Sequence, residues 1–152
     1  MARSDIKGMA ELQTTFKLLG RIPQTVSTKS ARAGASIALR AARRNAPEDT
    51  GDLKSGIIAK RERKTVPGKA VYDVMMDPAK NDIFVKISKD GKRSYYPASQ
   101  EYGFLTVDGG YIPGNRFLQR AITENNQEIE RKILEVTGKE VDKALRKRGG
   151  RA

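Results

Sequence analysis

The chain has 152 residues, of which 38% are apolar and 32% are charged, and its formal net charge is +12. This length fits one domain, 1–152, with a thin core. The absence of cysteine excludes disulfides and thiolate metal sites, and the absence of histidine removes the commonest catalytic base and metal ligand. We therefore expect a protein that is not an enzyme and that holds no cofactor or metal.

The sequence also bears on the compartment. The amino-terminal residues contain no apolar run of signal-peptide length, and no stretch approaches the ~18 apolar residues of a membrane-spanning helix. We expect a protein that stays in a reducing, soluble compartment and has no membrane partner.

The positive charge is unevenly distributed. Residues 1–65 carry 14 Lys and Arg against 6 Asp and Glu, a net +8, whereas residues 66–152 carry 16 against 12, a net +4. The excess lies in the first half and near a basic tail, 148–152. Such patches attract nucleic acid or an acidic protein surface through salt-sensitive steering. Composition does not choose between these two partners.

Residues 1–46 are predicted to form two helices. Apolar residues from Ile6 to Leu19 recur at spacings of three and four, which predicts a helix ending near Gly20. Pro23 then begins a second helix, whose buried face is mostly alanine. Its opposite face carries four arginines, Arg32, Arg40, Arg43 and Arg44. This face is either solvated or contacts phosphate groups, and the second role is disfavoured because no aromatic residues are interleaved to stack on bases.

An Asp49-Thr50-Gly51 triplet follows the second helix. In aspartic proteases the same triplet follows an apolar strand and brings two carboxylates together. Here it follows a basic helix that ends at Pro47, and Gly51 supplies a residue suited to positive φ. We interpret the triplet as a solvated turn and keep a protease that uses Asp49 as the minor alternative.

Residues 53–112 are predicted to be β-rich. Segments 70–76 and 83–87 read as the two strands of one hairpin, with Ile57-Ile58 as a third strand and Tyr111-Ile112 as a fourth. Three glycines and Pro113 make 104–114 a flexible loop or a protruding hairpin. The final helix, 115–147, is predicted to begin at Asn115 as its N-cap. The expected class is α+β, with a small antiparallel sheet packed by two N-terminal helices and one long C-terminal helix.

Three motifs occur in order along the chain. They are Ala42-Ala-Arg-Arg-Asn-Ala-Pro-Glu-Asp-Thr-Gly-Asp-Leu53, then Glu101-Tyr102-Gly103 after a Tyr-Tyr-Pro element, and then Pro113-Gly-Asn-Arg-Phe-Leu-Gln-Arg-Ala121. Together they resemble the tail-component family of tailed bacteriophages and prophages, also described as neck, tail-completion or head-tail joining proteins. The resemblance spans about residues 5–135. It departs from the family pattern where Phe104 follows the triplet and where Gly114-Asn115 precede Arg116, so contacts of the loop 104–112 are not carried over.

The resemblance implies a structural virion protein without an active site, assembled in the host cytoplasm. It implies a subunit of a ring, similar to the sixfold rings of phage tails, placed where the DNA-filled head meets the tail. The implied partners are further copies of the chain, neighbouring neck and tail proteins (a head-closure ring, a tail terminator or a tail tube), and DNA passing through the lumen with non-specific contacts at most. The alternative is a basic nucleic-acid-binding module.

We expect two surfaces to serve this assembly. The first is an interface rich in aromatic residues, which bury large area with few rotors to freeze; for Phe117, packing within the chain is the competing role. The interface residues are Tyr95, Tyr96, Glu101, Tyr102, Phe104, Arg116 and Phe117. The second is a basic docking surface made of Arg32, Arg40, Arg43 and Arg44.

Overall fold

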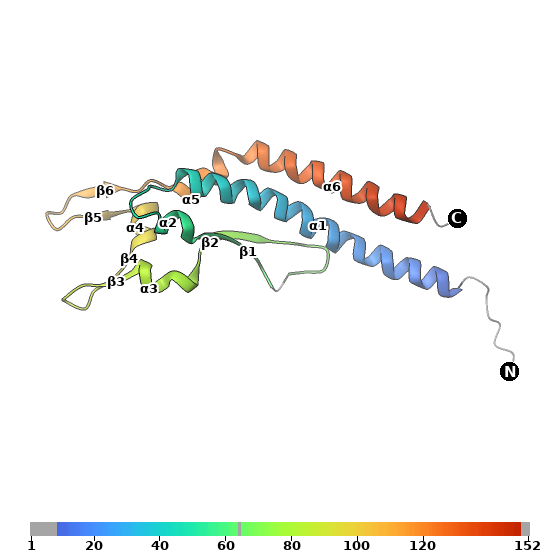
Figure 1. Cartoon of the computed structure of the whole chain (residues 1–152), viewed down its shortest axis with the longest axis horizontal. Coiled ribbons are helices and arrows are strands. Elements are labelled where there is room, and N and C mark those ends of the chain that lie inside the picture. The colour runs from blue at the N-terminus through green and yellow to red at the C-terminus, as the bar shows by residue number, and fades with distance from the viewer. Residues whose placement is uncertain (1–8, 64, 150–152) are drawn as a thin grey trace.

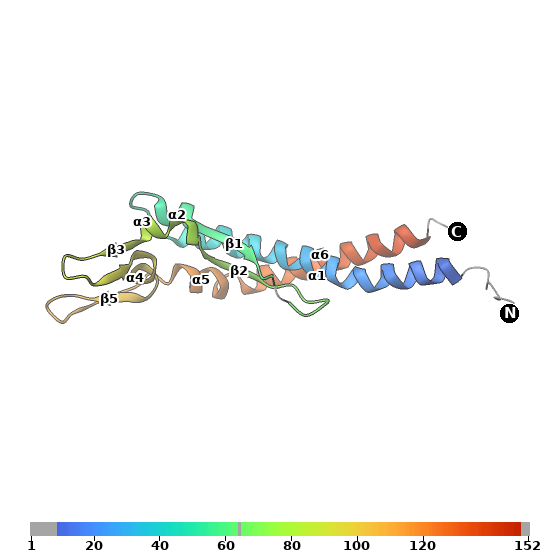
Figure 2. The ribbon, with the colours of Figure 1, turned by 90° about the horizontal axis from the view of Figure 1, so that it is seen from below.

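A computed structural model describes residues 9–63 and 65–149 as an elongated molecule built along two long helices (Figure 1). Helix α1 (Met9–Asn45) and helix α6 (Asn126–Gly149) lie side by side in both views (Figures 1 and 2). The shorter helical elements gather near the carboxyl-terminal half of α1. They are α2 (Asp52–Gly56), the 3-10 turn η1 (Pro78–Lys80), α3 (Asn81–Phe84), α4 (Tyr96–Tyr102) and α5 (Phe117–Thr123). None of the described helices has the length and apolar character needed to cross a membrane.

The strands confirm the α+β class but not the single sheet. Within the described residues they form three separate two-stranded antiparallel sheets. Strand β1 (Ile57–Arg61) pairs with β2 (Tyr72–Met76), β3 (Val85–Ile87) with β4 (Arg93–Tyr95), and β5 (Gly103–Leu105) with β6 (Tyr111–Pro113). The β3–β4 and β5–β6 hairpins project from the same end of the molecule (Figure 1).

The predicted hairpin of 70–76 with 83–87 is wrong. Strand β2 pairs instead with β1, in a register that places Ile57 opposite Met76. The physical reason is the connection after β2, where the Asp77 carboxylate accepts a hydrogen bond from the Ala79 amide and starts η1. Because η1 and α3 occupy residues 78–84, the chain makes a helical detour there and no tight turn joins β2 to β3.

The predicted break between two N-terminal helices is also wrong, because α1 runs without interruption through Pro23. A proline inside a helix removes one hydrogen bond and is costly, so tertiary contacts must stabilise this stretch. The Gln24 side chain accepts from the Gly68 amide (2.8 Å) and donates to the Lys69 carbonyl (3.2 Å), and Ser27 Oγ donates to the Gly68 carbonyl (2.6 Å). These bonds fix the loop of the β1–β2 hairpin on α1. The predicted first helix includes Ile6, which lies among residues 1–8, outside the described residues.

Helices α1 and α6 pack closely because the contact residues are small or matched. A Cβ on Gly34 would lie 2.9 Å from the Ile133 side chain, so glycine allows this approach. Ser30 and Thr137 hydroxyls hydrogen-bond across the interface (2.8 Å), and Lys29 pairs with Glu140 (2.5 Å). The Lys29 ammonium lowers the pKa of Glu140 below its ordinary value, opposed by some desolvation.

The C-terminal helix predicted over 115–147 is interrupted. Helix α5 ends at Thr123 and α6 begins at Asn126. The Asn125 side chain donates to the Ala121 carbonyl (2.9 Å), and the Asn125 amide donates to the Ile122 carbonyl (3.2 Å). An asparagine that bonds to nearby backbone in this way competes with helix propagation. Of the predicted basic tail 148–152, residues 150–152 lie outside the described residues.

The core lies where α1, α5 and the β1–β2 hairpin meet. Its buried members are Ala41, Ala42, Ala46, Leu53, Ile57, Met76, Phe84, Phe117 and Ala121. The alanines of α1 lie in this core, on the face that the sequence predicted to be buried and mostly alanine. The Phe84 ring lies edge-on to the Tyr95 ring with centroids 6.3 Å apart, in a favoured aromatic geometry.

Candidate assembly interface

Two of the sequence motifs meet at the junction of α4 and α5. Glu101, at the end of α4, is only 4% exposed. Its carboxylate accepts hydrogen bonds from the amides of Leu118 (2.9 Å) and Gln119 (3.0 Å). A carboxylate in this place satisfies the amides that a helix start leaves without partners and interacts favourably with the helix dipole. Glu101 therefore caps α5 from another element.

Two glycines let the backbone cross itself beside this cap. A Cβ on Gly103 would lie 2.2 Å from the Ile112 carbonyl oxygen, and one on Gly114 would lie 2.3 Å from the Glu101 carbonyl oxygen. The amides of Asn115 and Arg116 donate to the carbonyls of Gln100 (2.7 Å) and Glu101 (3.1 Å). The β5–β6 hairpin is therefore fixed at its root by backbone hydrogen bonds.

The predicted N-cap at Asn115 is wrong by one residue. Arg116 takes the cap position with left-handed backbone angles, φ 55° and ψ 39°. Only Arg116 adopts positive φ among the described residues other than glycine. This conformation costs an L-residue roughly 1–2 kcal/mol, so the arginine side chain occupies a place where glycine or asparagine is the ordinary choice.

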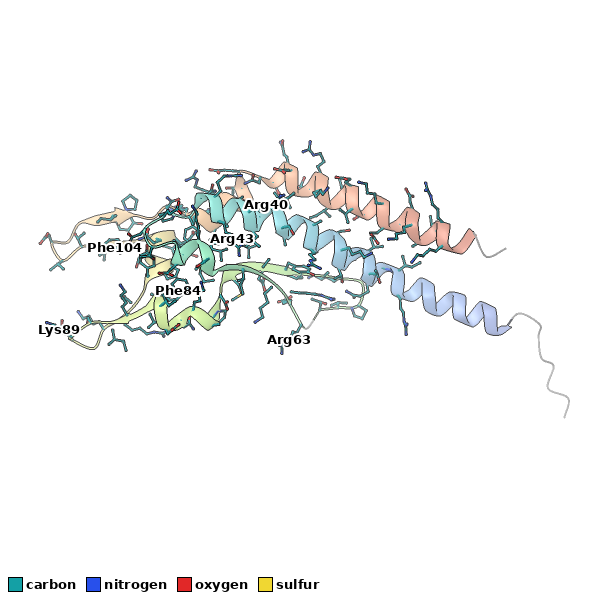
Figure 3. The ribbon with its side chains drawn as sticks, in the orientation of Figure 1. Arg40, Arg43, Arg63, Phe84, Lys89 and Phe104 are labelled. Atoms are coloured by element: carbon teal, nitrogen blue, oxygen red, sulfur yellow. The ribbon has the colours of Figure 1, made fainter. Side chains whose placement is uncertain are left out.

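We call residues 102–113 the β5–β6 arm. Tyr102 is 72% exposed, Leu105 is 76% exposed and Val107 is fully exposed. Phe104, labelled on the arm in Figure 3, and Tyr111 are also exposed. Thr106 and Gly110 close the turn through an amide-to-carbonyl bond of 2.8 Å. The segment predicted as a flexible loop or protruding hairpin thus contains paired strands with an unusually apolar surface.

The arm is also poor in charge. Residues 94–115 are the longest stretch of the chain without Lys or Arg, and Asp108 is the only charged residue between Tyr102 and Asn115. The neighbouring β3–β4 hairpin has the opposite character, because Lys86, Lys89, Lys92 and Arg93 are all exposed there. Figure 3 labels Lys89 at the end of this hairpin. We did not predict this basic hairpin, although its cations flank an Asp90-Gly91 turn signal in the sequence.

The seven predicted interface residues divide by burial. Phe117 is fully buried in the core, Glu101 is buried as the α5 cap, and Tyr95 and Tyr96 are half-buried against the core. The exposed members are Tyr102, Phe104 and Arg116. The Arg116 guanidinium donates to Gln119 Oε1 (3.1 Å). These three residues are the part of the predicted set that another molecule can reach directly.

The predicted basic surface also divides. Arg43 donates from its guanidinium to the Ile57 carbonyl, at 2.8 and 3.2 Å, and so ties α1 to β1. Arg43 is itself exposed, as are the remaining members, Arg32, Arg40 and Arg44. Figure 3 labels Arg40 and Arg43 along α1. A test of this face as a docking surface must leave Arg43 intact, because Arg43 also holds the fold.

The Asp49-Thr50-Gly51 triplet forms a surface turn in which Asp49 is exposed. Thr50 Oγ1 donates to the Asp52 carboxylate (2.6 Å), and Gly51 has φ 82°. The turn chemistry inferred from the sequence therefore matches the backbone. Within the described part of the chain, no group of three or more Asp and Glu side chains is placed to hold a metal ion.

Comparison with known proteins gives one family. Residues 10–80 match the family described as "Bacteriophage HK97-gp10, putative tail-component". This segment covers most of α1, the Asp49–Gly51 turn and the β1–β2 hairpin, whereas the arm and α5 lie beyond it. No curated protein and no solved structure matches the chain. The match agrees with the resemblance drawn from the motifs and supports a structural role as a component of the phage tail.

Proposed function

Because residues 10–80 match the phage tail-component family, we propose that this chain is a neck or tail-completion subunit. In this role, copies of the chain form a ring, sixfold by its resemblance to other phage-tail rings, that joins the DNA-filled head to the tail. The observation that carries the proposal is the exposed, cation-free β5–β6 arm on a chain of net charge +12. A monomer gains nothing from such a surface, whereas a subunit buries it against a neighbour.

Ring formation suits the arrangement of the arm. The arm extends from one end of an elongated molecule, so it can reach a different surface on a neighbouring copy (Figure 1). Contacts between two different surfaces are heterologous, and they close into a ring when the rotation between copies permits it. Many copies then share the stabilisation, and a thin monomer core is sufficient.

The basic face of α1 is the proposed docking surface for an acidic neighbouring ring. Arg32, Arg40 and Arg44 are exposed, and their guanidinium groups can form charge-assisted hydrogen bonds with carboxylates. A lumen that passes DNA is poorly served by many phosphate contacts, because each contact slows sliding. We therefore assign this face to protein docking.

Electron cryo-microscopy of purified particles tests the role. Mass spectrometry of the same particles identifies the subunit, and the map locates it. We expect a ring of this chain between capsid and tail, with the arm in contact with another subunit. Absence of the chain from purified particles would reject the joining role and leave an assembly factor or a nucleic-acid binder.

Charge reversal tests the docking face. The double variant Arg40→Glu and Arg44→Glu should keep the unfolding temperature and lose tail attachment, measured as the fraction of tailed particles. The matched control, Lys89→Glu with Lys92→Glu, makes the same change in net charge on the β3–β4 hairpin and should attach tails normally. Equal loss with both pairs would mean that only the overall charge matters.

A nucleic-acid-binding module is the second candidate, and one groove favours it. Where the amino-terminal half of α1 lies along α6, a groove is lined by Arg21, Lys29, Lys143 and Lys147, and also by Glu140, which pairs with Lys29. If this groove binds DNA, affinity for a short duplex should fall steeply with salt, with a slope on a log-log plot of about −0.9 per phosphate contacted. Affinity that persists without such a slope, or no affinity at low salt, would reject this candidate.

A further inference from the structure

An open groove lies beside the root of the β5–β6 arm. Its apolar lining comes from Ala38 of α1, Val74 of β2, and Leu118, Ala121 and Ile122 of α5. Ile122 is 53% exposed although it is large and apolar. The Arg116 side chain also lines the groove. A surface of this kind suits an apolar segment that carries a negative charge.

The arm has the complementary chemistry. At its far end the arm presents Leu105, the last residue of β5, and Val107 in the turn, both exposed, with Asp108 next to Val107. Tyr102, at the root of the arm, lines the groove of its own chain, whereas none of residues 103–113 does. With about 3.3 Å of rise per strand residue, five residues carry the turn roughly 15 Å from the root. The end of the arm is therefore available to a groove on another molecule.

We propose that the β5–β6 arm of one copy docks in the α5 groove of the next copy. Leu105 and Val107 pack against Leu118 and Ile122, and Asp108 pairs with Arg116. The inference rests on the proposed ring and names the contact that builds it. Since the groove and the end of the arm are different surfaces, the contact is heterologous, as a ring requires.

The local charges of the arm and the groove favour a second copy as the occupant, although the net charges of two copies oppose their association. Two molecules of net charge +12 repel each other over most of their surfaces. The segment 94–115 is the longest part of the chain without Lys or Arg, so it adds no positive charge when two copies meet. Glu101 does not repel Asp108 strongly, because its carboxylate is bound by two amides of α5. The Arg116 guanidinium has five N–H donors and remains a suitable partner after donating to Gln119.

The backbone of Arg116 adds a second argument. Left-handed angles disfavour arginine relative to glycine. Arginine at this position therefore lowers folding stability. We attribute its presence to a role of its side chain, which lies in the groove.

Cysteine trapping tests the contact directly, because the chain has no cysteine of its own. Full-length Val107→Cys and Ile122→Cys proteins are mixed under mild oxidation with oxidised glutathione, and disulfide-linked heterodimers are quantified by mass spectrometry. The matched control mixes Val107→Cys with Val66→Cys, since Val66 is also a large, exposed apolar residue, and it lies outside the groove. We expect the first pair to link faster than the control pair. Equal rates, or faster linkage of Val107→Cys to itself, would overturn the proposal.

A charge swap sharpens the test. In the trapping pair, Asp108→Arg on the arm partner should slow linkage to the control rate, and Arg116→Asp on the groove partner should restore it. Arg116→Gly, which relieves the left-handed backbone, should slow linkage without lowering the unfolding temperature. Failure of the swap to restore linkage would remove the Asp108–Arg116 pair from the proposal.

The two proposals fail separately. Efficient trapping by a chain that is absent from phage particles would reject the joining role and keep the arm contact. A ring in particles whose arms contact a different protein would keep the role and reject the second copy as occupant.

Discussion

The β1–β2 and β5–β6 hairpins are both antiparallel pairs, but the fold uses them in opposite ways. In the first, Ile57 is fully buried and Met76 nearly so, and the loop is bound to α1 through Gln24 and Ser27. In the second, Leu105 and Val107 point into solvent, and the contacts that hold the hairpin lie at its root. An isolated two-stranded hairpin is marginally stable in water. The first hairpin obtains its apolar partner within the chain, and the second presents its apolar surface for one outside it.

The largest expected difference comes from truncating one apolar residue in each hairpin. Ile57→Ala should lower the free energy of unfolding by about 2–5 kcal/mol, because it leaves a cavity in the core. Leu105→Ala should change it by less than about 0.5 kcal/mol, because the side chain is already in water. Urea denaturation followed by circular dichroism measures both. Similar losses would mean that the arm is packed within the monomer and would break the comparison.

The next largest effect on stability is expected from substituting two glycines of the β5–β6 hairpin. Gly103 and Gly109 both have positive φ, but only Gly103 faces backbone atoms closely. Gly109→Ala should cost about 1–2 kcal/mol from the left-handed conformation. Gly103→Ala should cost roughly 1–3 kcal/mol more, because the new Cβ forces the Ile112 carbonyl away. Thermal unfolding of the two variants compares them, and an equal shift would show that the root is not a fixed crossing.

Removal of the α5 cap tests what holds the arm in place. Glu101→Ala should lower the free energy of unfolding by about 1–3 kcal/mol, since it leaves two amides of α5 without their acceptor. Hydrogen exchange should accelerate at Leu118 and Gln119. Glu124→Ala, which removes an exposed partner of Arg120, is the control and should cost less than about 1 kcal/mol. Unchanged exchange at α5 would reject the capping role.

The smallest expected effect on stability concerns the α1–α6 helix pair rather than either hairpin. Lys29 lowers the pKa of Glu140, so the folded chain prefers the ionised carboxylate. This contribution is present above the ordinary glutamate pKa of 4.5 and is lost as the pH falls through the lowered value. Glu140→Gln should therefore reduce stability slightly at pH 7 and leave it unchanged in acid. A larger deficit in acid than at pH 7 would contradict this sign.

The sequence predicted those parts of the fold whose signals are local. The alanine face of α1, its end before Pro47, the Asp49–Gly51 turn and a strand at 72–76 follow from periodicity and turn chemistry. The continuous helix through Pro23 did not, because Gly20 and Pro23 are local helix breakers whose effect is offset by bonds to residues about 45 positions away. Strand pairing failed for a related reason, since the side-chain pattern of β2 does not distinguish β1 from β3 as its neighbour.

The candidate interface was predictable in part. The aromatic cluster and the motifs around Glu101 and Arg116 pointed to the segment that forms the α4–α5 junction and the exposed arm. Burial then divided the set, because no sequence period tells that Phe117 lies in the core while Phe104 is exposed. The capping role of Glu101 depends on an element 17 residues away, so a search for caps adjacent to the helix could not find it.

The root of the arm also determines how the molecule responds to mechanical load. A pull on the arm acts first on the hydrogen bonds of Asn115 and Arg116 to α4, and on the Glu101 carboxylate that holds α5. Helix α5 is anchored by Phe117 and Ala121 in the same core as α1. Tension at the end of the arm is therefore transmitted through backbone bonds to the long helices, so a neighbour that pulls on the arm loads the whole subunit.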